Sequence, residues 1–159
     1  MEKIKERKIY FDMDGTIADL YSVNGWLDDL RAENTTPYEN ALPMYNMEAL
    51  NELLEILVTL GFKIGVITWG SMDASEEYNK RVRQVKKQWI KDNLPVVSEF
   101  HFQRYGTPKY RASYQNININ HDILFDDNAE VREMWKNKGG VAINPDNDNL
   151  FTELIKLLS

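Results

Sequence analysis

The stretch at residues 8–16, Lys-Ile-Tyr-Phe-Asp-Met-Asp-Gly-Thr, decides the fold and locates the chemistry. A short apolar run ends abruptly at Asp12, and Asp14 follows one residue later. An apolar run bounded by turn residues is typical of a buried strand. In a parallel sheet, ligands bind just beyond the carboxyl ends of the strands. The stretch therefore predicts a buried strand that delivers two aspartates to a binding site.

Further apolar runs alternate with segments of helical periodicity. We predict the remaining strands at residues 62–68, 100–102, 122–125 and 141–143. Helices are predicted at residues 47–60, 78–89, 131–135 and 150–158, with Asn46 and Asn128 as N-caps. This alternation predicts an α/β fold, Rossmann-like and three-layered, whose mainly parallel sheet has about five strands with helices on both faces.

Residues 20–45 depart from this alternation. Leucines and a valine in its first part are spaced to line a short helix, and Thr35-Thr36-Pro37 predicts the end of that helix. A length of 159 residues suits one domain with one core. We therefore expect a single domain over residues 1–159, with a small cap insertion at about 20–45 above the strand ends. Its aromatic residues Tyr21, Trp26 and Tyr38 either contact substrate or pack the insertion down.

Composition excludes several classes of function. The absence of cysteine excludes disulfides, thiolate metal sites and cysteine nucleophiles. A formal net charge of −6 argues against a general nucleic-acid-binding surface. No segment approaches the length of a membrane span, so we expect no membrane association and a cytoplasmic location.

A basic cluster accompanies the helix predicted at residues 78–89. Its members are Lys80, Arg81, Arg83, Lys86, Lys87 and Lys91. Apolar core positions interrupt the cluster, so we interpret it as a solvated helix face.

Reactive residues follow several of the predicted strands. Thr68 ends the second strand, Asp126 and Asp127 end the fourth, and Lys109 lies in the loop after the third. Converging carboxylates repel one another unless a cation holds them. Mg²⁺ prefers oxygen ligands and also binds phosphate oxygens. The residues therefore predict a magnesium site at which Thr68 and Lys109 bind a phosphoryl group.

The same residues suggest how the reaction proceeds. Asp12 would attack phosphorus and form an aspartyl-phosphate. Asp14 would protonate the leaving alkoxide and later deprotonate the attacking water. Gly15 permits the tight turn that brings backbone N–H groups to the phosphate.

These residues resemble the four motifs of haloacid-dehalogenase-like phosphatases, in the order typical of that family. The motifs are Asp12-Met13-Asp14-Gly15-Thr16, Val66-Ile67-Thr68, Lys109, and Leu124-Phe125-Asp126-Asp127-Asn128. The resemblance implies Mg²⁺ ligation by the Asp12 side chain, the Asp14 backbone carbonyl and one carboxylate of the fourth motif. We favour Asp127 as that ligand and leave Asp126 as the alternative; Arg104 and Arg111 are alternatives to Lys109.

Residues 11–19 also resemble the start of the 5′(3′)-deoxyribonucleotidase branch, including its Ala18-Asp19. This resemblance implies a nucleoside monophosphate as substrate, with Trp69 either stacking on the base or packing locally. Trp69 stands where the branch commonly has serine, and the insertion is much shorter than that branch's cap.

Two alternatives remain at the sequence level. A small cap would admit a phosphorylated nucleic-acid end or a phosphoprotein in place of a small phosphorylated substrate. A non-catalytic metal- or phosphate-binding module would be expected to lack the nucleophile or the acid/base. Both Asp12 and Asp14 are present, which favours an enzyme.

Overall fold

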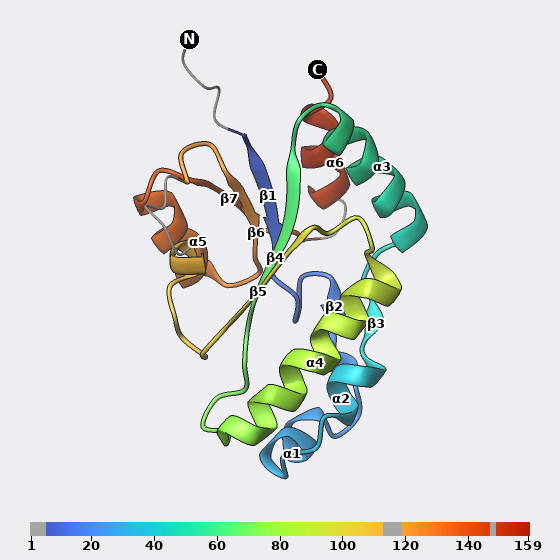
Figure 1. Ribbon diagram of the computed structural model, residues 1–159, viewed down its shortest axis with the longest axis vertical. Coiled ribbons are helices and arrows are strands. Elements are labelled where there is room, and N and C mark those ends of the chain that lie inside the picture. Colours follow the sequence, from blue (N-terminus) through green and yellow to red (C-terminus); the bar gives the residue numbers. More distant parts are fainter. Residues whose placement is uncertain (1–5, 113–118, 147–148) are drawn as a thin grey trace.

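A five-stranded parallel sheet forms the centre of the computed structural model, which describes residues 6–112, 119–146 and 149–159 (Figure 1). The strand order is β5-β4-β1-β6-β7. The strands are β1 (Lys8–Phe11), β4 (Lys63–Trp69), β5 (Glu99–Gln103), β6 (Ile123–Phe125) and β7 (Val141–Ile143). Every predicted strand is present, and no boundary differs by more than one residue. The α/β prediction is therefore confirmed.

Alternating side chains of the strands bury two faces of the sheet. Ile9 and Phe11 contribute to one core cluster, and Tyr10 between them contributes to the other. The first face is covered by α3 (Met47–Thr59), the C-terminal part of α4 (Glu76–Asn93) and α6 (Asn149–Lys156). The second face is covered by α5 (Ala129–Asn137) and the short helix η2 (Lys109–Ala112). Figure 1 shows α5 on one side of the sheet and α3 with α6 on the other, which are the three layers expected.

Both predicted N-caps are confirmed. The Asn46 side chain accepts a hydrogen bond from the backbone of Ala49, and the Asn128 side chain accepts from Glu130 and Val131. These bonds satisfy donors that the first helical turn leaves unpaired.

Among the helices of the described residues, none has the length and hydrophobicity of a membrane-spanning segment.

The insertion contains more structure than the sequence predicts. It includes the antiparallel pair β2 (Ala18–Asp19) and β3 (Leu42–Pro43), the short helix η1 (Leu20–Ser22), α1 (Trp26–Arg31) and α2 (Thr36–Asn40). Pro37 lies in the first turn of α2, where backbone N–H groups have no acceptor within the helix, so a residue without an N–H is tolerated. The break at Pro37 is real, but a second helix starts there, which the sequence analysis did not predict. Tyr38 of α2 is buried against Tyr78 and Val82 of α4, and Figure 1 shows α1 and α2 beside the first turns of α4.

Replacing Leu54 by alanine tests the packing of α3 on the sheet. Leu54 is completely buried, whereas Ile56 on the same helix is 50% exposed. Because the deletion leaves a cavity, Leu54→Ala should lower the free energy of unfolding by about 2–5 kcal/mol. The control Ile56→Ala should change it by about 0.5 kcal/mol or less. Urea unfolding followed by circular dichroism measures both, and equal losses would contradict this placement of α3.

Candidate active site

Adjacent parallel strands bring three carboxylates together. Phe11 of β1 pairs with Phe125 of β6, so the residues that follow each strand are neighbours. The backbone N–H of Asp12 donates to the carbonyl of Phe125 at 2.9 Å. One carboxylate oxygen from each of Asp12, Asp126 and Asp127 lies within 4.8 Å of the others. We call these residues the three-carboxylate cluster.

Lys109 neutralises part of the charge of this cluster. Its Nζ donates to Asp12 Oδ1 and to Asp126 Oδ2, each at 2.7 Å. Burial of the side chain lowers the pKa of Lys109, but the two carboxylates raise that pKa by more, so the lysine stays charged. The alternatives Arg104 and Arg111 are exposed. Of these three cations, the structure brings Lys109 into the site.

Trp69 covers Lys109 at the end of β4. The Lys109 Nζ lies 5.4 Å from the centroid of the indole ring. The indole N–H donates to the carbonyl of Thr107 at 2.9 Å, and the ring packs edge-on against Tyr105. Trp69 also lines the pocket described below. It therefore holds the loop that carries Lys109 and presents an aromatic surface to any ligand.

Asp14 pairs with a lysine that the sequence analysis assigned to the solvent. Lys86 of α4 is 1% exposed. Its Nζ donates to Asp14 Oδ2 at 2.9 Å, to Thr68 Oγ1 at 2.8 Å and to the carbonyl of Trp69 at 2.7 Å. The prediction of a solvated basic face is therefore wrong for Lys86, because this position faces the interior on the same stripe as Val82. The other five members of the cluster are exposed, as predicted.

The turn after β1 holds the Asp12 carboxylate in place. Thr16 donates from Oγ1 to Asp12 Oδ2 at 3.0 Å and accepts from the backbone N–H of Asp127 at 3.3 Å. Gly15 has a φ of 81°, and a Cβ there would collide with the Asp127 carboxylate. Glycine is thus required both by the backbone conformation and by the close approach of Asp127.

Burial and mutual repulsion raise the pKa values of these acids. Burial, followed by the charge of Asp12, raises the pKa of Asp126 to about 6. Partial burial and then Asp12 also raise the pKa of Asp127 to about 7. Burial raises the pKa of Asp14, although Lys86 opposes the shift. Carboxylates that resist ionisation together are well suited to hold a cation, and an all-oxygen donor set fits a hard metal ion.

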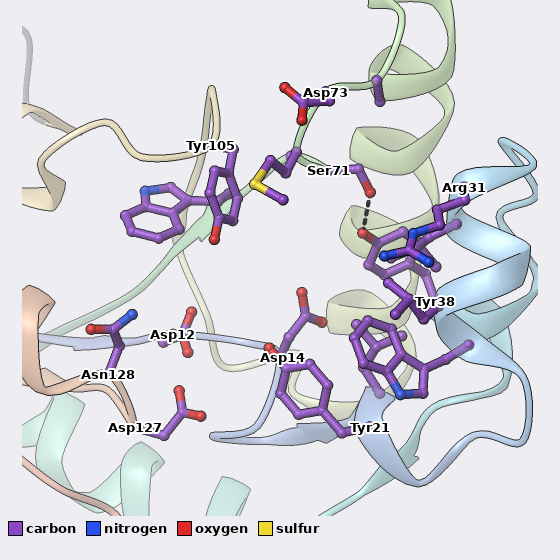
Figure 2. Close-up of a pocket in the computed structure, with 18 of the residues that line it drawn as sticks. Asp12, Asp14, Tyr21, Arg31, Tyr38, Ser71, Asp73, Tyr105, Asp127 and Asn128 are labelled. Atoms are coloured by element: carbon purple, nitrogen blue, oxygen red, sulfur yellow. Dashed lines mark hydrogen bonds between the residues drawn. The ribbon is translucent and has the colours of Figure 1, made fainter.

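The three-carboxylate cluster and Asp14 open onto a pocket of about 580 Å³. Figure 2 shows Asp12 and Asp127 at one end of this space, Tyr38 and Arg31 at the other, and Asp14 between them. Each of the aromatic residues Tyr21, Trp26 and Tyr38 lines the pocket and also packs within the insertion. Thr68 lies behind the pocket wall, where it is 1% exposed.

Comparisons with known proteins establish the fold. No family model and no curated protein matches the chain. A hydrolase from Streptococcus pneumoniae TIGR4 aligns with a TM-score of 0.58 and 14% identity, over 96% of this chain and 100% of its own. An uncharacterized protein from Corynebacterium glutamicum ATCC 13032 Kitasato aligns with a TM-score of 0.54 and 14% identity, over 96% of this chain and 95% of its own. The class defined is thus a Rossmann-like α/β fold with carboxylates at the ends of its strands.

Two residues of the site received no role from the sequence analysis. Thr16 belongs to the first motif, and its hydroxyl orients the proposed nucleophile. Lys86 had a usable signal: it lies four residues after Val82 and three before Trp89, on the buried stripe of its helix. A lysine on a buried stripe requires a buried partner.

Removing one carboxylate tests the electrostatics of the cluster. Without a metal ion, the folded protein binds a proton at Asp127 more tightly than the unfolded chain does, because its pKa rises from 3.8 to about 7. The free energy of unfolding in EDTA should therefore fall as pH rises from about 4 to about 7. Asp127→Asn should flatten this decline and raise the melting temperature at pH 8.

Adding Mg²⁺ should reverse the effect in the wild type. A bound cation replaces the proton, so the gain in melting temperature should be larger at pH 8 than at pH 5 and should disappear in Asp127→Asn. Asp28→Asn, at an exposed aspartate outside the cluster, is the matched control. An identical pH profile in Asp127→Asn and wild type would contradict this electrostatic description.

Proposed function

We propose that this chain is a magnesium-dependent phosphomonoester hydrolase of the haloacid-dehalogenase-like type, with Asp12 as its nucleophile. The observation that carries the proposal is the setting of the Asp12 carboxylate. It faces the pocket beside Asp126 and Asp127, 2.7 Å from the Lys109 ammonium. A carboxylate so placed is oriented for attack on an incoming phosphoryl group. The description of the Streptococcus pneumoniae neighbour as a hydrolase supports the same class.

The donor set supports a magnesium site. Mg²⁺ would be held by the Asp12 side chain, the Asp14 backbone carbonyl and one of the two carboxylates that directly follow β6. Asp127 is the better candidate, because both oxygens of Asp126 already accept hydrogen bonds from Lys109 and from the backbone N–H of Asn128. When bound, the ion would offset the negative charge of the phosphoryl oxygens.

The residues account for both halves of the hydrolysis. An Asp12 oxygen attacks phosphorus, and the bond to the leaving oxygen breaks as that oxygen takes the proton of Asp14. Water then attacks phosphorus, Asp14 takes its proton, and the Asp12 carboxylate is released. The sum converts a phosphomonoester and water into an alcohol and inorganic phosphate. The raised pKa of Asp14 is consistent with a proton donor in the first half.

Lys109 lines the pocket and would bind the transferred phosphoryl group. Lys109 contributes charge, and its two carboxylate partners fix its position. Thr68 lies behind the pocket wall and accepts a hydrogen bond from Lys86, so in this structure it supports Lys86 and does not reach the phosphoryl group. Trp69, together with the pocket aromatics, would contact the rest of the substrate.

The pocket favours a small substrate. Its volume of about 580 Å³ lies within the roughly 300–1,000 Å³ of small-molecule sites. Its aromatic walls suit a flat base, so a nucleoside monophosphate is the proposed substrate class. A phosphorylated nucleic-acid end or phosphoprotein would extend past the insertion that covers the pocket. A binding module without turnover does not explain why nucleophile and acid are both present.

Asp12→Asn tests the proposed nucleophile. Asparagine has nearly the same size as aspartate but no carboxylate oxygen that can attack phosphorus. Phosphate release from p-nitrophenyl phosphate and from nucleotides should therefore fall about 10³-fold or more. EDTA should abolish wild-type turnover, and Mg²⁺ should restore it. Asp28→Asn serves as the control. Turnover that survives in Asp12→Asn would contradict the assignment of Asp12 as the nucleophile.

Substrate size is tested separately. The ratio kcat/KM should be at least about 10-fold higher for nucleoside 5′-monophosphates than for a 5′- or 3′-phosphorylated oligonucleotide, because a pocket of about 580 Å³ has the volume of a small-molecule site. A preference for the oligonucleotide would favour the macromolecular alternative while leaving the chemistry intact.

A further inference from the structure

Lys86 is a buried cation whose hydrogen-bonding capacity is fully used. An ammonium has three N–H donors. Those of Lys86 reach three acceptors at 2.7–2.9 Å, which are Asp14 Oδ2, Thr68 Oγ1 and the carbonyl of Trp69. The ring of Tyr38 covers the ammonium, with its centroid 4.9 Å from Nζ. The side chain is therefore fixed in one position by four groups from three segments: the turn after β1, the end of β4, and α2.

Burial of the Lys86 ammonium costs desolvation free energy, which an apolar side chain at this position would not. Buried ion pairs are often replaceable by apolar residues of similar size without loss of stability. Lys86 lies among the buried residues Val82, Trp89 and Ile90, where a methionine would fill the same space. The contacts of Lys86 indicate why a lysine is present: it donates a hydrogen bond to Asp14, the proposed acid/base, which lines the pocket.

The contact with Asp14 leaves one carboxylate oxygen available. Oδ2 is held by Lys86, whereas Oδ1 makes no hydrogen bond within the described residues. Asp14 lines the pocket and Lys86 does not, so Lys86 reaches the reacting atoms only through its partners. Figure 2 shows Asp14 directed into the pocket next to Tyr21.

We propose that Lys86 is a positioning residue that fixes the Asp14 carboxyl group so that its free oxygen meets the leaving oxygen of the substrate. This inference rests on the proposed phosphatase function. The proton still moves from Asp14 to the leaving oxygen as the phosphorus–oxygen bond breaks; Lys86 neither gains nor loses a proton in the step. Tyr38 belongs to α2 of the insertion. Its ring covers the Lys86 ammonium and its hydroxyl is hydrogen-bonded to Ser71 at 2.5 Å, so it connects the insertion to this arrangement.

Leaving groups that differ in their need for an acid provide the test. An alkyl leaving group, as in a nucleoside 5′-monophosphate, needs protonation, whereas p-nitrophenolate departs largely without it. The ratio kcat/KM reports the steps up to the first irreversible one, here formation of the aspartyl-phosphate. Lys86→Met should lower kcat/KM about 10²-fold for the alkyl phosphate and less than about 10-fold for p-nitrophenyl phosphate. Lys87→Met, at the exposed neighbouring position, is the matched control.

A double-mutant cycle separates positioning from a structural role. If Lys86 acts through Asp14, Lys86→Met should cause almost no further loss in an Asp14→Asn background with the alkyl phosphate. Lys86→Arg keeps the charge and the N–H donors, so it should restore part of the kcat/KM for the alkyl phosphate that Lys86→Met loses. If circular dichroism shows that Lys86→Met does not fold, Lys86→Gln is measured on the same two substrates instead.

The outcomes distinguish this inference from the proposed function. Equal losses on both substrates, no loss on either, or independent effects in the double mutant would overturn the positioning role while leaving an active phosphatase. A wild type inactive on every phosphomonoester would overturn the proposed function itself.

Discussion

Three carboxylates held within 4.8 Å of one another are the constraint on which the rest of the site depends. Parallel pairing of β1 with β6 forces Asp12 and Asp126 to be neighbours, and Asp127 follows directly. Burial, and then the charge of Asp12, raise the pKa values of Asp126 and Asp127. A cation in this position relieves the repulsion between the carboxylates, and a phosphoryl group brought to the same place meets an oriented nucleophile. Lys109 offsets part of the cost of holding like charges together, and a bound cation would offset more of it.

Two buried lysines divide the task of balancing these charges. Lys109 bridges Asp12 and Asp126, and Lys86 holds Asp14 on the other side of the first motif. They come from different segments, η2 and α4, and an aromatic ring covers each ammonium. In a chain with a net charge of −6, these two cations are placed where acidic groups converge. Fixed partners of this kind reduce the reorganisation required when charge moves during a reaction.

Periodicity in the sequence was sufficient for the sheet and its helices, because burial of strand and helix faces dominates their formation. It was insufficient for α2, where Pro37 reads as a break and also begins a helix. It was also insufficient for Lys86, because contact with Asp14 joins residues 72 positions apart and depends on how α4 packs. The motif residues could be predicted as a group, since strand ends of a parallel sheet converge. Which of them touch one another depends on side-chain directions that spacing does not encode.

Direct detection of a phosphorylated Asp12 tests the central claim. The protein would be quenched with acid during turnover of p-nitrophenyl phosphate with Mg²⁺, reduced with borohydride to trap the acyl phosphate, and digested for peptide mass spectrometry. The account predicts modification at Asp12, in the peptide that carries the first motif, dependent on both substrate and Mg²⁺. The reduction releases phosphate and leaves homoserine in place of the phosphorylated aspartate. Steady turnover with Asp12 unreduced, or reduction at another aspartate or glutamate, would contradict the account.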